Sequence, residues 1–253
     1  MDPRTTLLDN PLLAPWRAPF GLPPFEAITP AHFAPALHEA MRVHRAELDA
    51  IAADARAPDF DNTVAAFDRC GRLLARVEAV FHTLSASATS PALQAVQREL
   101  AAPMAAHYSA VYMHQPLFAR IDGLHAHRAD LGLDGQALRL LERVHLDFVR
   151  AGARLEPEPR ARYAQLMQRL AELHTAFAQN VLHDEAAFRL PLTTPADFAG
   201  LPEFVRAAAR QAAAERGVAE AEVITLARSL IVPFLSFSTR RDLREQAWRA
   251  WAG

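Results

Sequence analysis

The sequence contains no lysine, so all 27 of its basic residues are arginine. This excludes Schiff-base chemistry on a lysine and the lysine of a phosphate-binding P-loop. A single cysteine, Cys70, excludes an internal disulfide and a four-cysteine zinc site. No stretch approaches the roughly 18 uncharged, proline-free residues of a transmembrane helix. We therefore expect no membrane partner.

Clustered positive charge, which a nucleic-acid partner requires, is also lacking, because the formal net charge is −2. The first residues show no basic stretch followed by an apolar run, so we expect no secretory signal and a cytoplasmic location. Glycine is scarce, with nine residues, whereas alanine is abundant and 51% of the chain is hydrophobic. Because alanine is the best helix former and glycine among the poorest, the composition predicts a mostly α-helical protein.

The first 29 residues are rich in proline and therefore cannot form regular helix. Apolar side chains such as Leu12 and Trp16 are spread along this segment. We interpret residues 1–29 as an extended arm lying across a helical body. A proline-rich ligand for an aromatic groove of another protein is the alternative.

Capping residues and apolar spacing place the helices. Thr29 and Pro30 begin a helix that runs to about residue 55, and a second begins at Asn62 or Thr63 and extends past Leu84. Gly71 lies on the apolar stripe of this second helix, which indicates close contact with a neighbour. Further helices are predicted over about 90–114, 115–130, 134–152, 157–183 and 201–216, and from Thr239 onward, where Asp242 would complete a capping box.

Two short β-prone runs, 188–192 and 223–226, are predicted to pair as a ribbon beside the helix at 201–216. The predicted fold class is mostly α, a multi-helix lobe with one small two-stranded ribbon. The predicted domains are the arm (1–29), a helical bundle (30–183) and a mixed segment (184–253). The predicted helix from residue 157 carries an amphipathic stripe: Tyr163, Leu166, Leu170, Leu173, Phe177 and Val181.

Eleven histidines prompt a search for metal-binding and acid–base sites. The zinc-peptidase motif H-E-x-x-H begins at His38-Glu39, but Arg42 occupies the position of the second histidine. Glu142 and His145 have the spacing of one di-iron ligand pair, and no second pair accompanies them. We therefore expect both to be structural, with His145 beside the buried stripe and hydrogen-bonded to a neighbour.

The other chemically interesting residues also favour structural roles. His125 and His127 would project about 200° apart on a helix and chelate poorly. His174 and His183 lack a matching partner. Cys70 has no activating residue next to it in the sequence, so we expect a buried, unreactive thiol. We predict no catalytic, cofactor-binding or metal-ligating residue in this chain.

The ordered series of segments nevertheless resembles the thimet oligopeptidase family of zinc metallopeptidases, in its N-terminal region, and within it the bacterial dipeptidyl carboxypeptidase type. The resemblance is strongest from Pro58 to Phe81 and covers about residues 10–253. It rests on Asn10-Pro11-Leu12, Pro24-Phe25, His32-Phe33, Pro58-Asp59-Phe60-Asp61-Asn62-Thr63, Gly71-Arg72-Leu73-Leu74, Leu117-Phe118-Ala119-Arg120-Ile121-Asp122, Leu131-Gly132-Leu133-Asp134, Phe148-Val149-Arg150-Ala151-Gly152-Ala153 and Thr239-Arg240-Arg241-Asp242-Leu243-Arg244-Glu245.

The resemblance implies a longer parent enzyme that holds one zinc ion and cleaves short peptides with metal-activated water. In that family the N-terminal helices form one wall of a substrate channel, and the zinc ligands lie downstream of the region matched here. The dipeptidyl carboxypeptidase type would release C-terminal dipeptides. We therefore expect a non-catalytic part of a zinc peptidase, with peptides and the missing catalytic lobe as partners and no zinc in this chain.

A free-standing helical binding or scaffold module without enzymatic activity is the alternative. The two interpretations differ in what they predict for the last helix, which carries Trp248 and Trp251. A part of a larger enzyme should leave at least one of these indoles substantially exposed, whereas a self-contained module should bury both.

Overall fold

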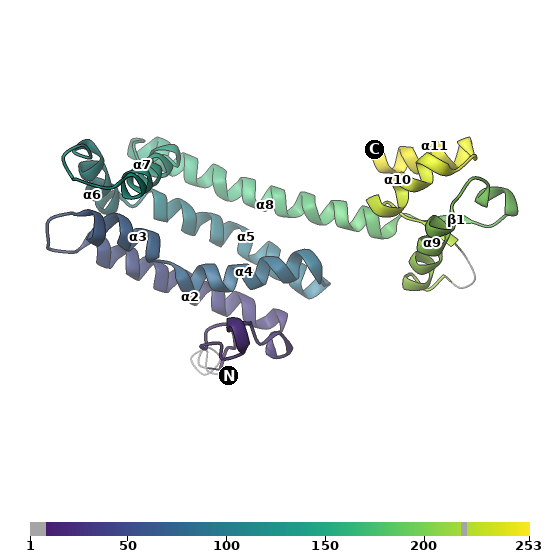
Figure 1. Ribbon diagram of the computed structural model, residues 1–253, viewed down its shortest axis with the longest axis horizontal. Helices are drawn as coiled ribbons and strands as arrows, with labels where there is room; N and C mark the ends of the chain where they lie inside the picture. Colours follow the sequence, from purple (N-terminus) through teal and green to yellow (C-terminus); the bar gives the residue numbers. More distant parts are fainter. Residues whose placement is uncertain (1–8, 219–221) are drawn as a thin grey trace. The chain divides into compact units, whose positions relative to one another are not determined.

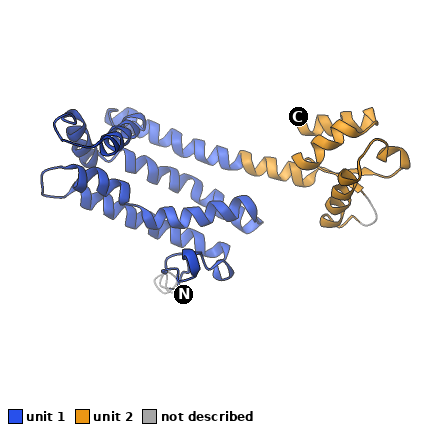
Figure 2. Cartoon of the chain, in the orientation of Figure 1, with its two compact units in different colours: residues 1–176 blue, residues 177–253 orange. Residues whose placement is uncertain are grey.

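The computed structural model describes residues 9–218 and 222–253. The chain divides into two compact units, residues 1–176 and 177–253 (Figure 2). Helices make up most of both units, and one two-stranded sheet accompanies them in the second, so the predicted fold class is confirmed. Within the described residues no helix is long and apolar enough to cross a membrane.

Long helices form the first unit (Figure 1). α2 (Pro30–Ala52) contacts α4 (Arg72–Ser87), α5 (Pro91–Tyr112) and α6 (Gln115–Ala126), and α6 packs on α7 (Gly135–Arg150). The predicted helix starts agree with the caps, because the side chains of Ser90 and Asp134 each accept a hydrogen bond from the amide three residues on. α8 (Pro157–Ala187) extends from this unit into the second.

The described part of the arm, residues 9–29, lies against the helical body and contains two 3₁₀ turns, η1 (Pro19–Gly21) and η2 (Phe25–Ala27). Leu12 is fully buried in the core of the first unit. Asn10 donates its side-chain amide to the His32 carbonyl at 2.8 Å, and Arg76 on α4 donates to the Leu12 carbonyl at 2.9 Å. The Arg76 guanidinium also lies over the Trp16 ring. The arm is thus attached to both α2 and α4.

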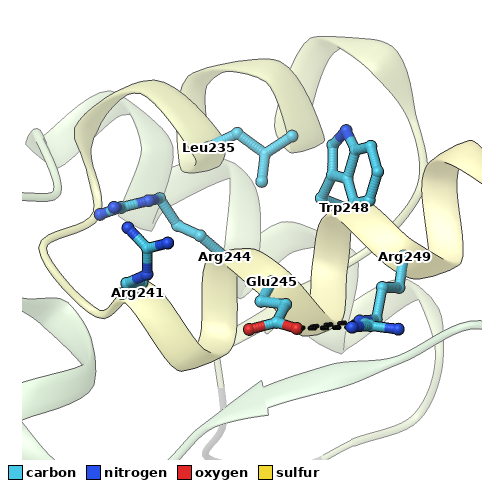
Figure 3. A pocket seen from close by; sticks show the side chains of 6 residues that line it. All are labelled: Leu235, Arg241, Arg244, Glu245, Trp248 and Arg249. Atoms are coloured by element: carbon cyan, nitrogen blue, oxygen red, sulfur yellow. Dashed lines mark hydrogen bonds and ion pairs between the residues drawn. The ribbon is translucent and has the colours of Figure 1, made fainter.

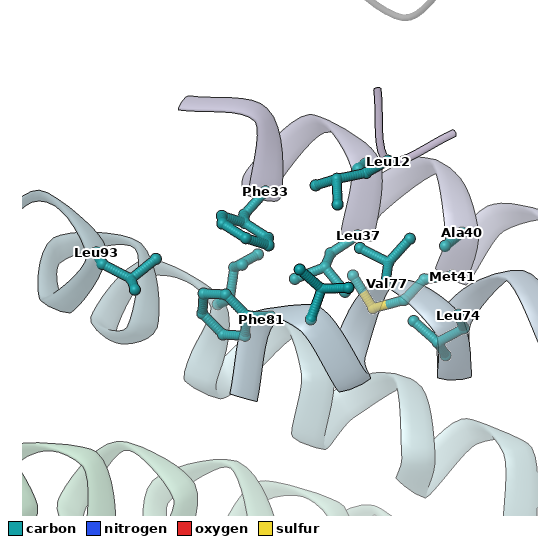
Figure 4. Close-up of a cluster of buried hydrophobic side chains, with 12 residues drawn as sticks. Leu12, Phe33, Leu37, Ala40, Met41, Leu74, Val77, Phe81 and Leu93 are labelled. Atoms are coloured by element: carbon teal, nitrogen blue, oxygen red, sulfur yellow. The ribbon is translucent and has the colours of Figure 1, made fainter. Parts of the chain in front are cut away.

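Two apolar clusters hold the first unit together. In one, Phe33 and Phe81 meet with ring centroids 5.1 Å apart, between α2 and α4 (Figure 4). The other is centred on the fully buried Phe148, whose ring contacts Phe67, Tyr112 and Phe118. Burying side chains of this size contributes about 1.5–3 kcal/mol each, so these two clusters provide the main stabilisation of the unit.

The predicted continuous helix through Gly71 is wrong. A π-helical turn, η3 (Phe60–Val64), leads into α3 (Ala65–Arg69), and the chain breaks at Cys70 and Gly71 before α4 begins. Gly71 has φ of 70°, in the left-handed region, and its amide donates to Glu47 Oε2 at 2.7 Å. The predicted close contact is present: a Cβ added at Gly71 would lie 3.0 Å from the His44 ring. Glycine serves the break between two consecutive helices here rather than a helix crossing.

The stripe predicted on α8 exists but is not buried. None of the 31 residues of α8 is buried, and Phe177 is 71% exposed. The apolar spacing indicated the helix correctly, because helical periodicity depends on side-chain type alone. The large apolar side chains that remain exposed on α8 are Leu166, Leu170, Leu173, Phe177, Val181 and Leu182.

The second unit contains the predicted ribbon. β1 (Leu190–Leu192) pairs antiparallel with β2 (Glu222–Ile224), so that Leu190 faces Ile224 across the ladder. α9 (Glu203–Glu215) packs against β2, and η4 (Pro195–Phe198) precedes it. Buried aliphatic side chains from the strands and α9 join Phe234 in one core. The ribbon and the predicted helix at 201–216 are confirmed.

The last two helices differ from the prediction. α10 (Arg228–Phe237) was not predicted, and α11 (Arg241–Ala252) begins two residues after Thr239. The capping box of Thr239 and Asp242 is wrong, because the Thr239 hydroxyl donates instead to the Ala199 carbonyl and Asp242 pairs with Arg240. Arg240 also pairs with the buried Asp197, which fixes the start of α11 to η4.

Candidate functional site

One buried polar chain links α2, α5 and the break between α3 and α4. His44 Nδ1 lies 3.0 Å from His107 Nε2, and His44 Nε2 lies 3.3 Å from Cys70 Sγ. His44 and His107 are buried and Cys70 is half-buried. The sequence did not reveal this arrangement, because the three residues are 26 and 37 positions apart and no spacing rule connects them. The only sequence signal for this cluster was that two histidines, His44 and His107, lie on the core faces of their helices.

The pKa values of His44, Cys70 and His107 favour a structural role for these three side chains over a catalytic one. Burial, followed by the charge of Glu47, raises the pKa of the Cys70 thiol to about 12, and the thiol donates to the Phe67 carbonyl. Burial lowers the pKa of His44 and lowers that of His107 to about 4. A cysteine nucleophile needs thiolate near neutral pH, which this environment opposes. The expected unreactive thiol is thus supported, although an imidazole does lie beside it.

Glu142 and His145, the possible ligand pair, are separated by their environments. His145 is buried, and its Nε2 lies 2.8 Å from Asp122 Oδ1, which also accepts from Arg154 at 3.0 Å. Glu142 is half-buried and lies near Arg128 and Arg139 instead. The prediction that His145 lies on the buried face and is hydrogen-bonded to a neighbour is confirmed.

The other histidines do not assemble a metal site with these residues. The His125 ring stacks flat on His145, with centroids 3.7 Å apart, which turns its nitrogens away from a shared centre. His127 bonds to the Gly123 carbonyl, and Arg42, in the place of a second zinc ligand, pairs with Glu39. Across residues 9–218 and 222–253, no group of three or more His, Cys, Asp or Glu side chains could hold a metal ion.

A pocket of about 470 Å³ lies on the outer face of α10 and α11 (Figure 3). Arg241 and Arg244 line one end of it, and Trp248 and Leu235 form its apolar end. Glu245 is engaged by Arg249 at 2.8 Å. The pocket therefore combines an apolar surface with an excess of positive charge.

The tryptophans of α11 are exposed, Trp248 to 56% and Trp251 to 44%. The prediction that at least one of them is accessible in this chain is confirmed. Ala247, the residue before Trp248, is fully buried in the core of the second unit. α11 thus packs through its small side chain and presents its largest side chains outward, the reverse of the usual arrangement.

Comparison with known proteins shows similarity to peptidases over nearly the whole chain. Dipeptidyl carboxypeptidase of Salmonella typhimurium is 36% identical over 241 residues, and that of Escherichia coli is 35% identical over 241 residues. Oligopeptidase A of Salmonella typhimurium is 28% identical over 246 residues. These matches cover 95–97% of this chain and 35% of each relative. No family model matches the sequence.

The names of these relatives are those of peptidases that act on chain ends or on short chains. The predicted resemblance to the N-terminal region of the thimet oligopeptidase family is confirmed, with the dipeptidyl carboxypeptidases more similar than oligopeptidase A. The chain spans about a third of the length of these relatives.

Proposed function

We propose that this chain is the non-catalytic part of a zinc-dependent oligopeptidase of the dipeptidyl carboxypeptidase type, and forms one wall of its peptide channel. The observation that carries the proposal is the match at 35–36% identity over 95% of the chain to enzymes of that name. The channel-wall role comes from the family resemblance. The first unit offers long helices for this role, because α2 packs on both α4 and α5.

The zinc ion of such an enzyme would be held outside this sequence. The described residues provide no three-ligand group. The partial motif that begins at His38-Glu39 has Arg42 at the position of the second histidine. When bound elsewhere in the parent enzyme, zinc would supply the activated water for peptide hydrolysis. The residues of this chain would bind and enclose the peptide without touching the reacting atoms.

The catalytic lobe of the parent is the proposed partner of the second unit. Trp248 and Leu235 line the pocket on α10 and α11, and Trp248 and Trp251 both expose much of their indole rings. Tryptophan and arginine are enriched at the centres of protein interfaces, and α11 carries both.

A chimaera tests the proposal directly. The aligned third of Escherichia coli dipeptidyl carboxypeptidase is replaced by this chain, and zinc content and release of C-terminal dipeptides are measured. The expected product binds one zinc ion and retains dipeptide release. In a chimaera carrying Trp248→Ser and Trp251→Ser, the second unit should no longer pack on the catalytic lobe, whereas the exposed control Gln246→Ser should leave that packing intact. A folded, zinc-loaded chimaera without activity would overturn the channel-wall role.

A further inference from the structure

A second cavity, of about 350 Å³, lies within the first unit between α4, α5 and the first half of α8. Its volume falls in the range of small-ligand clefts, about 300–1,000 Å³. The walls are largely apolar, with Phe81, Met104 and the alanines at 101, 105 and 171, and His82, Gln97 and Thr175 add polar groups to the lining. A ligand in this cavity would therefore need an apolar body.

Glu78 provides the fixed charge of the cavity. Its Oε2 accepts a hydrogen bond from the Tyr108 hydroxyl at 2.5 Å, and both side chains line the cavity. Burial, together with the Glu78 carboxylate, holds the pKa of Tyr108 above its usual value, so the phenol keeps its proton and remains the donor. This bond fixes the orientation of the carboxylate and occupies only one of its two oxygens.

Glu78 differs from most other half-buried acids among the described residues, which pair with arginine, as Glu39 does with Arg42 and Asp147 does with Arg143. No ion pair involves Glu78 in the part of the chain that the structure describes. A carboxylate without a counter-ion in a largely apolar cleft is costly, and a cationic ligand offsets that cost.

We propose that this cavity binds the side chain of an arginine residue in a peptide. The planar guanidinium donates to the free oxygen of Glu78 and stacks on the ring of Tyr108, which is exposed. Its three-carbon stem packs against Met104 and Phe81. Arginine fits better than lysine, because its fork of donors engages a carboxylate of fixed orientation and its flat face suits an aromatic wall.

That the cation is carried by a short peptide rests on the proposed function, whereas recognition of the guanidinium does not. The test is therefore made without hydrolysis, by calorimetric titration of the whole chain with acetyl-Ala-Arg-Ala-amide. The matched ligand is the same peptide with citrulline, which replaces the charged guanidinium by a neutral urea of the same shape. Failure of the chimaera would leave this titration unaffected, so the two proposals fail separately.

The expected result is binding of the arginine peptide at least about 10-fold tighter than the citrulline peptide, the factor given by one charge-assisted hydrogen bond. Glu78→Gln should lower the affinity for arginine by a similar factor while keeping an acceptor for Tyr108. Glu99→Gln, an exposed acid on α5 that does not line the cavity, should leave affinity unchanged. Equal binding of the two peptides, no binding at millimolar concentration, or full affinity in Glu78→Gln would each overturn the proposal. The citrulline comparison decides it even where Glu78→Gln fails to fold.

Discussion

Replacing Gly71 with alanine tests the tight junction between α3 and α4. Gly71 has φ of 70°, and an alanine in the left-handed region costs about 1–2 kcal/mol. The new Cβ would also lie 3.0 Å from Cε1 and Nε2 of His44. That ring has little room to move, because it contacts Cys70 on one side and His107 on the other. Overpacking of this kind adds about 1–3 kcal/mol. We expect a total destabilisation of about 2–5 kcal/mol.

Gly132→Ala provides the matched control. Gly132 has φ of 62° in the same unit, and a Cβ added there meets no atom within 4 Å. Its substitution should therefore show the backbone cost alone. The free energy of unfolding is measured for both variants by urea titration with circular dichroism. The expected difference between them, about 1–3 kcal/mol, reports the contact with His44.

A double substitution then identifies the cause. Truncating His44 to alanine removes the ring that the new methyl group meets, so the extra cost of Gly71→Ala should shrink in that background. Gly71→Ala costing no more than Gly132→Ala would refute the reasoning. So would an extra cost that persists unchanged without the His44 ring, because the destabilisation would then arise from the backbone.

Three further measurements test other parts of the structure. Because the folded chain lowers the pKa of His44, and that of His107 to about 4, the unfolded chain binds more protons below pH 6.5. Stability should therefore be full above that pH and fall as pH drops toward 4. A melting series should give a shallower slope for His107→Phe, in which only the contribution of His44 remains, and an unchanged slope would contradict the reasoning. Elemental analysis after dialysis should find no stoichiometric zinc in this chain, and one tightly held ion would contradict the assignment of zinc to another part of the parent. Glu142→Ala should leave metal content unchanged and shift stability by less than about 1 kcal/mol, since Glu142 makes only exposed ion pairs, whereas Asp122→Ala should cost about 1–3 kcal/mol by leaving the buried His145 unpaired.

Local signals determined much of the fold. Ser90 and Asp134 predicted helix starts correctly because a side-chain cap acts on amides within three residues. The ribbon was predictable because β-branched residues at 223–225 favour a strand wherever the chain places them. The prediction of one continuous helix through Gly71 failed because the same apolar spacing fits either one helix or two helices joined by a glycine turn. Only the ring of His44, 27 residues earlier, distinguishes the two.

The polar clusters could not be predicted, because they depend on tertiary contacts. Nothing in the spacing of His44, Cys70 and His107 indicates that they meet. Glu78 and Tyr108 are 30 residues apart and come from different helices. The family resemblance was available from the sequence because it rests on an ordered series of segments. The exposure of the α8 stripe could not be predicted, since periodicity shows which face is apolar and not whether another element covers it.

Cys70 gives this protein an internal reporter of local opening. It is the one cysteine in the sequence, and its pKa of about 12 leaves almost no thiolate at neutral pH while the α3–α4 junction stays closed. When the junction opens, the thiol returns to water and to a pKa near 8.5, so its reactivity toward an alkylating reagent rises by orders of magnitude. The rate of alkylation of the native chain therefore measures how often this junction opens, without any label being introduced.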